Sequence, residues 1–284
     1  MTKPICLFDS GIGGLTVLKK LIQKYPNENY IYLADLANVP YGDKTKEEIK
    51  EIATNNIEWL SKFDPKIIIM ACNASSTVIA RDPSLHSGQA PQSHYVKQLG
   101  DCFVGLCPPR NDIPIYGMIE SCSKEIAISE YKKVSVWATK LVAENNAYKN
   151  AIQRINPSIT VEEVACPKLV PMIEGIDPNL TDKKQVIQEY IEKTSKDSQA
   201  LILGCTHYPL IQEDILKFTN LKIIDPADAL VNDLEKHLMP CRDAINRVST
   251  FYTTAQKEKV ERFVNIYLCG NCKFNAVDLK KVFV

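Results

Sequence analysis

Short runs of purely apolar residues, separated by amphipathic segments, constrain this chain more than any other feature of its sequence. In the first third, apolar runs fall at 4–8, 30–33 and 66–70, and apolar residues recur at helical spacing over 15–25 and 49–63. A strand that is apolar at every position must be covered on both faces, which is typical of parallel sheets between layers of helices. The sequence therefore predicts an α/β fold.

The same alternation resumes after residue 112 and again favours parallel sheets. The further predicted elements are strands at 113–119, 134–137, 159–164, 200–203 and 221–224, and helices at 141–155, 183–193 and 228–238.

Residues 81–112 interrupt this pattern. The stretch contains several prolines and glycines and has poor periodicity. Irregular segments of this length within a compact domain are usually functional or disordered. We hypothesise that this long loop overhangs a binding site or mediates contact between subunits.

Two of the predicted strands end in a cysteine. One run ends at Cys72, before Asn73, and the other at Cys205, before Thr206 and His207. Ligands of doubly wound sheets bind at the carboxyl ends of strands, so two such ends facing each other would place two thiols across one cleft. A cysteine that opens a helix is expected to have a lowered thiol pKa, although a buried cysteine is more often simply a small hydrophobic residue.

A glycine-rich segment, Asp-Ser-Gly-Ile-Gly-Gly at 9–14, follows the first predicted strand and precedes the first helix. Glycines permit a tight turn, and the free amides of a helix start favour a carboxylate or phosphate. The spacing matches neither the dinucleotide fingerprint nor the P-loop. The segment indicates an anion site or, equally well, a plain strand-to-helix turn. Pro-Tyr-Gly at 40–42 indicates only a turn.

Composition excludes several classes of function. Lys plus Arg and Asp plus Glu each number 34, and no long basic run exists, so nothing indicates nucleic-acid binding. No stretch is long enough to span a membrane, and the N-terminus lacks the pattern of a signal peptide. We therefore expect a cytoplasmic protein whose ten cysteines are free thiols. The isolated pair Cys269 and Cys272 is weak evidence for zinc or redox chemistry.

Taken together, the chain resembles the glutamate racemase family over nearly its whole length, excepting 81–112. The segments that carry the resemblance are Asp-Ser-Gly-Ile-Gly-Gly at 9–14, Pro-Tyr-Gly at 40–42, Ala-Cys-Asn at 71–73, Asn-Ala-Tyr at 146–148, Ala-Cys-Pro-Lys-Leu-Val-Pro-Met-Ile-Glu at 165–174 and Gly-Cys-Thr-His-Tyr-Pro at 204–209. The resemblance implies two similar parallel-sheet α/β domains with the active site in the cleft between them. The expected domains are 1–112 with 212–284, and 113–211.

The resemblance also implies a mechanism without pyridoxal phosphate or metal. One of Cys72 and Cys205 removes the α-proton of glutamate as a thiolate, and the other delivers a proton to the opposite face. Asp9 is expected to assist beside the first thiol, and His207 and Glu174 beside the second. The residues expected to contact substrate are Asp9, Ser10, Pro40, Tyr41, Gly42, Cys72, Asn73, Ala74, Ser75, Thr139, Cys205, Thr206 and His207.

Two positions depart from the family pattern. Ala74 and Val142 stand where the family usually has threonine, and each change removes a hydroxyl that could bind substrate. Such a hydrogen bond is worth about 0.5–1.5 kcal/mol. Three alternatives therefore stay open: a racemase of aspartate or another small acidic amino acid, a cysteine hydrolase with a single nucleophile, and an amino-acid-binding protein without turnover.

If the family reading holds, the product D-glutamate would supply peptidoglycan synthesis. The resemblance also allows a homodimer, but the sequence does not determine the oligomeric state, which varies in this family.

Overall fold

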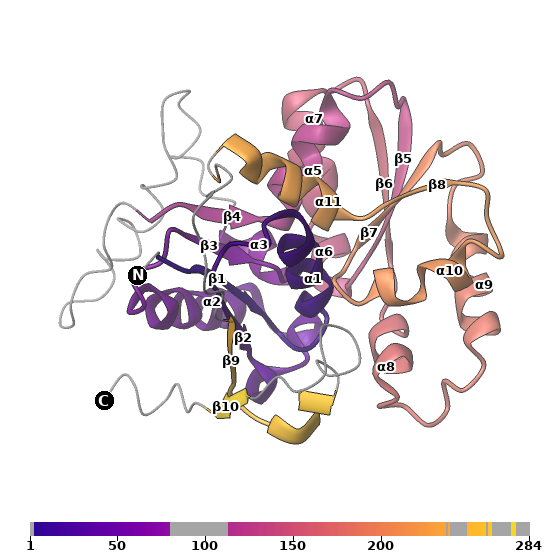
Figure 1. The fold of residues 1–284 in the computed structure, drawn as a ribbon. Coiled ribbons are helices and arrows are strands. Elements are labelled where there is room, and N and C mark those ends of the chain that lie inside the picture. The colour runs from indigo at the N-terminus through magenta and orange to yellow at the C-terminus, as the bar shows by residue number, and fades with distance from the viewer. Residues whose placement is uncertain are drawn as a thin grey trace.

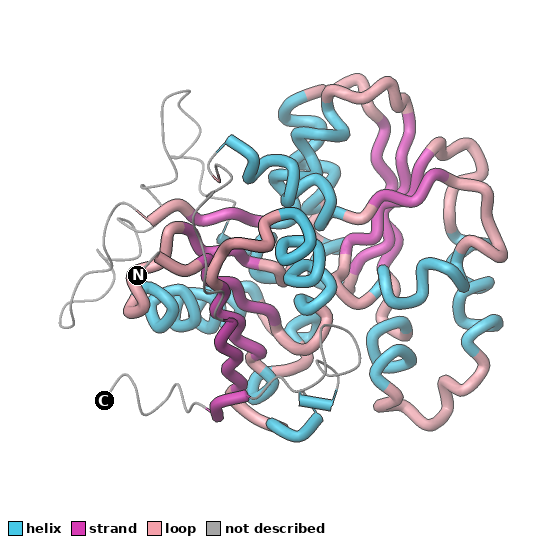
Figure 2. Tube along the Cα trace, in the orientation of Figure 1, coloured by secondary structure: helices cyan, strands magenta, loops and turns pink. Residues whose placement is uncertain are grey.

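The computed structural model describes residues 3–79, 113–236, 238, 249–259, 261–262 and 274–276. Figure 2 shows two groups of strands, each flanked by helices. The predictions made for 81–112 and for Cys269 and Cys272 lie outside the described residues.

The first sheet has six parallel strands in the order β10-β9-β2-β1-β3-β4. Its strands are β1 (Ile5–Asp9), β2 (Tyr30–Ala34), β3 (Ile67–Met70), β4 (Ile115–Gly117), β9 (Ser249–Thr253) and β10 (Phe274–Ala276).

Strand β1 shows why its sequence is apolar at successive positions. Ile5 and Leu7 pack into one core with helices α1 (Gly14–Lys24) and α11 (Pro226–Asp233). Cys6 and Phe8 pack into a second core with helix α2 (Lys46–Ser61) on the opposite face. Side chains alternate across a strand, so a sheet covered on both faces requires apolar residues throughout. The prediction of a parallel, doubly covered sheet is confirmed.

The second sheet has four parallel strands in the order β6-β5-β7-β8. Its strands are β5 (Lys133–Ala138), β6 (Thr160–Ala165), β7 (Ala200–Gly204) and β8 (Lys222–Ile224). The other α-helices named among the described residues are α3 (Asn73–Ile79), α5 (Met118–Ala127), α6 (Lys140–Glu144), α7 (Ala147–Ile155), α8 (Leu169–Glu174), α9 (Lys183–Lys193) and α10 (Gln212–Ile215). The prediction of two parallel-sheet α/β units is confirmed.

Three helix boundaries differ from the prediction for local reasons. Helix α2 begins three residues before 49, because Thr45 and Glu48 form a capping box at its N-terminus. The expected single helix at 141–155 is two helices, α6 and α7, because Asn146 adopts a left-handed conformation with φ of 47°. The expected strand at 113–119 is only β4, and helix α5 starts at Met118.

The two sheets divide the chain differently from the predicted boundaries at 112/113 and 211/212. Strand β4 follows the first boundary yet pairs with β3 in the first sheet. Strand β8 follows the second boundary yet pairs with β7 in the second sheet. Strand β4 is an edge strand of the first sheet, and β8 is an edge strand of the second. The chain therefore passes from one sheet to the other after these strands, later than the sequence predicts.

Helices α1, α5 and α11 lie between the two sheets (Figure 1). Within α11, Leu230 belongs to the core of the first sheet, and Ala229 belongs to a core shared with α5, β5 and β7. These helices therefore hold the two sheets in a fixed relation, in which residues from the strand ends of both can meet.

No helix in the described part of the chain is long and apolar enough to cross a membrane.

Candidate active site

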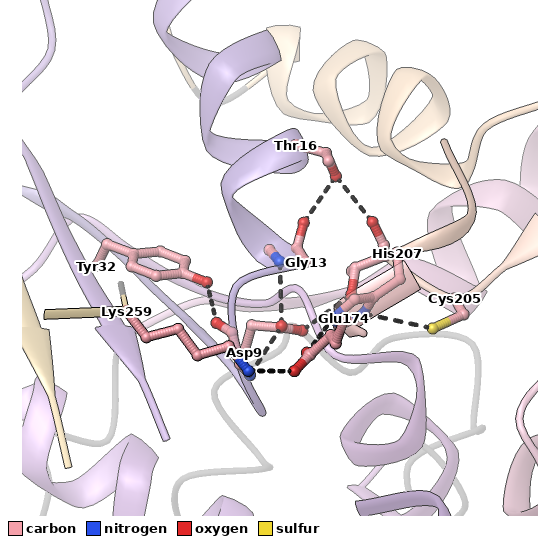
Figure 3. Close-up of polar contacts among 11 residues, drawn as sticks. Asp9, Gly13, Thr16, Tyr32, Glu174, Cys205, His207 and Lys259 are labelled. Atoms are coloured by element: carbon pink, nitrogen blue, oxygen red, sulfur yellow. Dashed lines mark hydrogen bonds and ion pairs between the residues drawn. The ribbon is translucent and has the colours of Figure 1, made fainter. Parts of the chain in front are cut away.

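Asp9 ends strand β1 and closes the glycine-rich turn before α1. Its Oδ2 accepts hydrogen bonds from the backbone N–H groups of Gly11 and Gly14, each 3.0 Å long (Figure 3). The side chain is fully buried. Burial raises the pKa of Asp9, and the nearby His207 and the two backbone N–H groups oppose the rise only in part. The glycine-rich segment therefore binds its own carboxylate at the helix start.

The carboxyl end of β7, from the second sheet, contacts this turn directly. Thr206 Oγ1 donates to Asp9 Oδ1 over 3.3 Å. Thr16 Oγ1, on α1, lies 3.2 Å from the Thr206 carbonyl oxygen, to which it donates. Figure 3 shows both the α1 turn and the β7 end converging on Asp9. The ends of strands from two different sheets thus form one continuous polar site.

A series of polar side-chain contacts begins at Cys205. Its Sγ lies 3.9 Å from His207 Nδ1, and His207 Nε2 lies 2.7 Å from Glu174 Oε1. Glu174 is the last residue of α8, which ends there because Gly175 adopts a left-handed φ of 64°. The second oxygen of Glu174 accepts a hydrogen bond of 2.8 Å from Lys259 (Figure 3).

The histidine and the glutamate stabilise each other's charges. Burial alone would lower the pKa of His207, but Cys205 and Glu174 raise it above its ordinary value. Burial would raise the pKa of Glu174, but hydrogen bonds and charge from His207, and then from Lys259, lower it. At neutral pH a protonated imidazole therefore faces the Cys205 sulfur.

Cys72 has a different environment at the end of β3. Burial, followed by the charge of Asp9, raises its pKa to about 12, although hydrogen bonds from Ser75 and Ser10 act in the opposite direction. The expectation that the start of α3 would lower this pKa is wrong, because desolvation of the thiolate outweighs the helix terminus. Cys72 is therefore a neutral thiol at neutral pH, and Cys205 contributes to its electrostatic surroundings.

Several buried polar atoms near the thiols have no hydrogen-bond partner among the described residues. They are Asn73 Nδ2, Ser75 Oγ and Thr139 Oγ1. Asn73 is held in place through its other amide atom, since Tyr148 donates to Asn73 Oδ1 over 2.6 Å. Buried polar groups rarely stay unpaired, so these three atoms are suited to binding a polar ligand.

The Pro40–Tyr41–Gly42 segment also approaches the second sheet. A Cβ at Gly42 would lie 3.3 Å from Thr139 Cβ. Tyr41 is buried, and its hydroxyl donates to Asp35 Oδ2 over 2.5 Å. Pro40, which directly precedes Tyr41, is exposed.

The two departures from the family pattern lie in one apolar core. Ala74 and Val142 are both buried, and the core that contains them also contains Cys72 and Tyr41. Neither side chain can donate a hydrogen bond, so this core is more apolar than threonine at the two positions would make it.

Sequence reasoning missed two residues of the site. Tyr32 donates from its hydroxyl to the Gly11 carbonyl over 2.7 Å and so supports the glycine-rich turn. Lys259 binds Glu174 from a segment whose sequence is typical of an ordinary exposed helix. Neither residue stands in a motif, so only the folded structure brings them to the site.

Comparisons with known proteins identify the family. The model of the Asp/Glu/Hydantoin racemase family matches residues 103–234. A glutamate racemase of Fusobacterium nucleatum is 35% identical over 232 residues, which cover 81% of this chain and 79% of that protein. The chain belongs to the glutamate racemase family. Its members are isomerases that act on amino acids, so the two-cysteine arrangement belongs to a racemase scaffold.

Solved structures agree over the whole length. Glutamate racemase from Francisella tularensis, determined in complex with D-glutamate, is 30% identical with a TM-score of 0.78, and the match covers 98% of both chains. A glutamate racemase isoform from Bacillus anthracis is 27% identical with a TM-score of 0.80, again over 98% of both chains.

Proposed function

We propose that this protein interconverts L-glutamate and D-glutamate by proton transfer between Cys72 and Cys205, without a cofactor. The proposal draws on the family membership and on the Francisella relative, whose structure contains D-glutamate. The observation that carries it is the position of the two cysteines. Cys72 follows strand β3 of the first sheet, Cys205 follows strand β7 of the second, and Cys205 is among the groups that act electrostatically on Cys72.

Racemisation needs a base on one face of the α-carbon and an acid on the other. In the state described here, Cys205 is suited to be the base, because the protonated His207 imidazole faces its sulfur. Cys72 is suited to be the acid, because it holds its proton at neutral pH. Cys205 would remove the α-proton, and Cys72 would protonate the planar carbanion from the opposite side. The reverse reaction begins with these protonation states exchanged.

The remaining residues support the two thiols. Asp9 and Ser10 lie beside Cys72, and Glu174 holds His207 beside Cys205. Asn73, Ser75 and Thr139 supply the unpaired polar atoms that would bind the substrate's carboxylate and ammonium groups. Preorganised donors of this kind also stabilise charge that develops in the transition state.

Glutamate is the preferred substrate in this proposal because the relatives from Fusobacterium nucleatum and Francisella tularensis are glutamate racemases. The apolar side chains of Ala74 and Val142, where the family usually has threonine, favour a second candidate, another small acidic amino acid.

The deciding experiment is incubation with L-glutamate in deuterium oxide without added cofactor. We expect loss of optical rotation together with deuterium incorporation at the α-carbon. The same assay with D-glutamate, L-aspartate and D-aspartate serves as the specificity control. Turnover of aspartate but not glutamate would select the second candidate, and no α-exchange with any of the four would contradict the racemase proposal.

The product would provide D-glutamate for peptidoglycan in the cytoplasm of a bacterial host. Depletion of the protein in such a host should then create a growth requirement for D-glutamate. Growth without that supplement would separate this protein from cell-wall synthesis. The homodimer expectation is checked by light scattering of the purified chain.

A further inference from the structure

Lys259 reaches from the first sheet to the second. It lies six residues beyond the end of β9, and its Nζ binds Glu174 Oε2, at the end of α8, over 2.8 Å. The Glu174 side chain is only 5% exposed, whereas that of Lys259 is 37% exposed. The ion pair therefore joins a partly exposed cation to a carboxylate that is buried in the site.

The backbone that carries Lys259 is tied to the first sheet. Thr254 Oγ1 donates to Asp35 Oδ1 over 2.8 Å and accepts from the backbone N–H of Ala37 over the same distance. Gln256 adopts a left-handed φ of 49°, and its carbonyl accepts from the N–H of Lys259 over 3.0 Å. These contacts fix where the lysine side chain starts, so its approach to Glu174 follows from the fold of the segment.

Lys259 and His207 each bind one of the two carboxylate oxygens of Glu174. Lys259 occupies Oε2 and His207 Nε2 occupies Oε1. A carboxylate held at both oxygens cannot rotate without breaking a charge-assisted hydrogen bond. The histidine ring is thereby fixed at Nε2, which leaves Nδ1 directed at Cys205.

We infer that Lys259 is a positioning residue for this half of the site: by holding Glu174 it keeps the His207 ring aligned with the Cys205 sulfur. The inference deepens the proposed racemase function and rests on it. Lys259 contacts neither thiol in the structure, so its effect passes through Glu174 and His207.

The charged and titratable groups around this pair determine the expected pH dependence. Besides Lys259, the pair is faced by Cys205 at the end of β7, Asp9 at the end of β1 and Tyr32 on β2. Lys259 is among the groups that lower the Glu174 pKa. Removing the charge of Lys259 therefore raises the pKa of Glu174. On acidification, Glu174 is then protonated at a higher pH than in wild type, and the activity that needs its ionised form is lost at that higher pH.

The test compares Lys259→Met, Lys259→Arg and the matched control Lys257→Met. Lys257 belongs to the same segment and is also partly exposed, but its partner is Glu261 rather than a site residue. Because misplacement of a catalytic group by about 1 Å can cost up to about 100-fold, we expect Lys259→Met to lower kcat at least about 10-fold with little change in KM. The acidic limb of its pH–rate profile should move to higher pH. Lys259→Arg should restore most of the rate, and Lys257→Met should match wild type.

A second readout does not depend on racemisation. Cys205 and Cys72 are similarly buried, at 7% and 6% exposed, so their alkylation rates can be compared within one molecule by mass spectrometry. The neutral reagent iodoacetamide avoids any change in electrostatic attraction. Lys259→Met should slow alkylation of Cys205 relative to Cys72, and Lys257→Met should leave the ratio unchanged.

Three results would overturn the inference. A rise in KM with unchanged kcat would make Lys259 a substrate contact, and equal effects of Lys259→Met and Lys257→Met would indicate a general charge effect. An unchanged ratio of alkylation rates in Lys259→Met would remove the link to Cys205. If wild type does not racemise any substrate, the function fails, but the alkylation ratio still tests the positioning role.

Discussion

Replacing either Cys72 or Cys205 with serine should abolish racemisation in both directions. A serine hydroxyl keeps the size and position of the group but cannot form an anion near neutral pH. Since each direction uses one residue as base and the other as acid, the loss of either stops both. General acid–base groups typically contribute about 10²–10⁴-fold, so each variant should lose at least about 100-fold in kcat when optical rotation is followed.

Isotope exchange in the same variants tests whether Cys72 and Cys205 act on opposite faces of the substrate α-carbon. With one thiol intact, a single enantiomer should still exchange its α-hydrogen with deuterium oxide, and the two serine variants should do so with opposite enantiomers. Cys6→Ala is the matched control, because Cys6 is a buried free cysteine of β1 that packs away from the site. It should racemise like wild type. A protein in which only one of the two serine variants is impaired would instead fit a cysteine hydrolase.

The sheets could be predicted from sequence because a strand that is buried on both faces needs an unbroken run of apolar residues. Ile67–Met70 and Ala200–Gly204 are buried at every position, and each run is apolar enough to be recognised without knowledge of its neighbours. The two cysteines could be predicted as a pair for the same reason, since each directly follows or nearly follows such a run. Family resemblance then added Glu174, at the end of α8, and His207, in the turn after β7.

Other features depend on contacts between distant segments. The high pKa of Cys72 reflects burial and Asp9, which lies 63 residues earlier in the chain. Lys259 binds a residue 85 positions away, from a segment with no motif. The predicted boundaries place β4 in the second domain and β8 in the first, but β4 pairs with β3 in the first sheet and β8 pairs with β7 in the second. Pairing at a sheet edge depends on the neighbouring strand and not on sequence order.

Gly13→Ala is expected to be the most damaging substitution that replaces no side chain of the site. The backbone at Gly13 is already helical, with φ of −59° and ψ of −38°, so alanine by itself would add about 0.4–1 kcal/mol of stability. The added Cβ, however, would lie 2.3 Å from Thr206 Oγ1 and 2.5 Å from His207 Nδ1. Neither distance is compatible with non-bonded contact, so α1 or the 205–207 turn must move.

Either movement separates Asp9 from Thr206 or turns His207 away from Cys205. Overpacking of this kind costs about 1–3 kcal/mol of unfolding free energy, whereas a shift of about 1 Å in a catalytic group can cost about 100-fold in rate. Gly13→Ala should therefore remain folded in urea titration but lose at least about 100-fold in kcat/KM. Gly11→Ala is the steric control for stability: its Cβ would meet no atom closer than 3.5 Å, so its unfolding free energy should stay near that of wild type. Wild-type turnover by Gly13→Ala would mean that the α1 turn and the β7 end do not need the close approach seen between the two sheets.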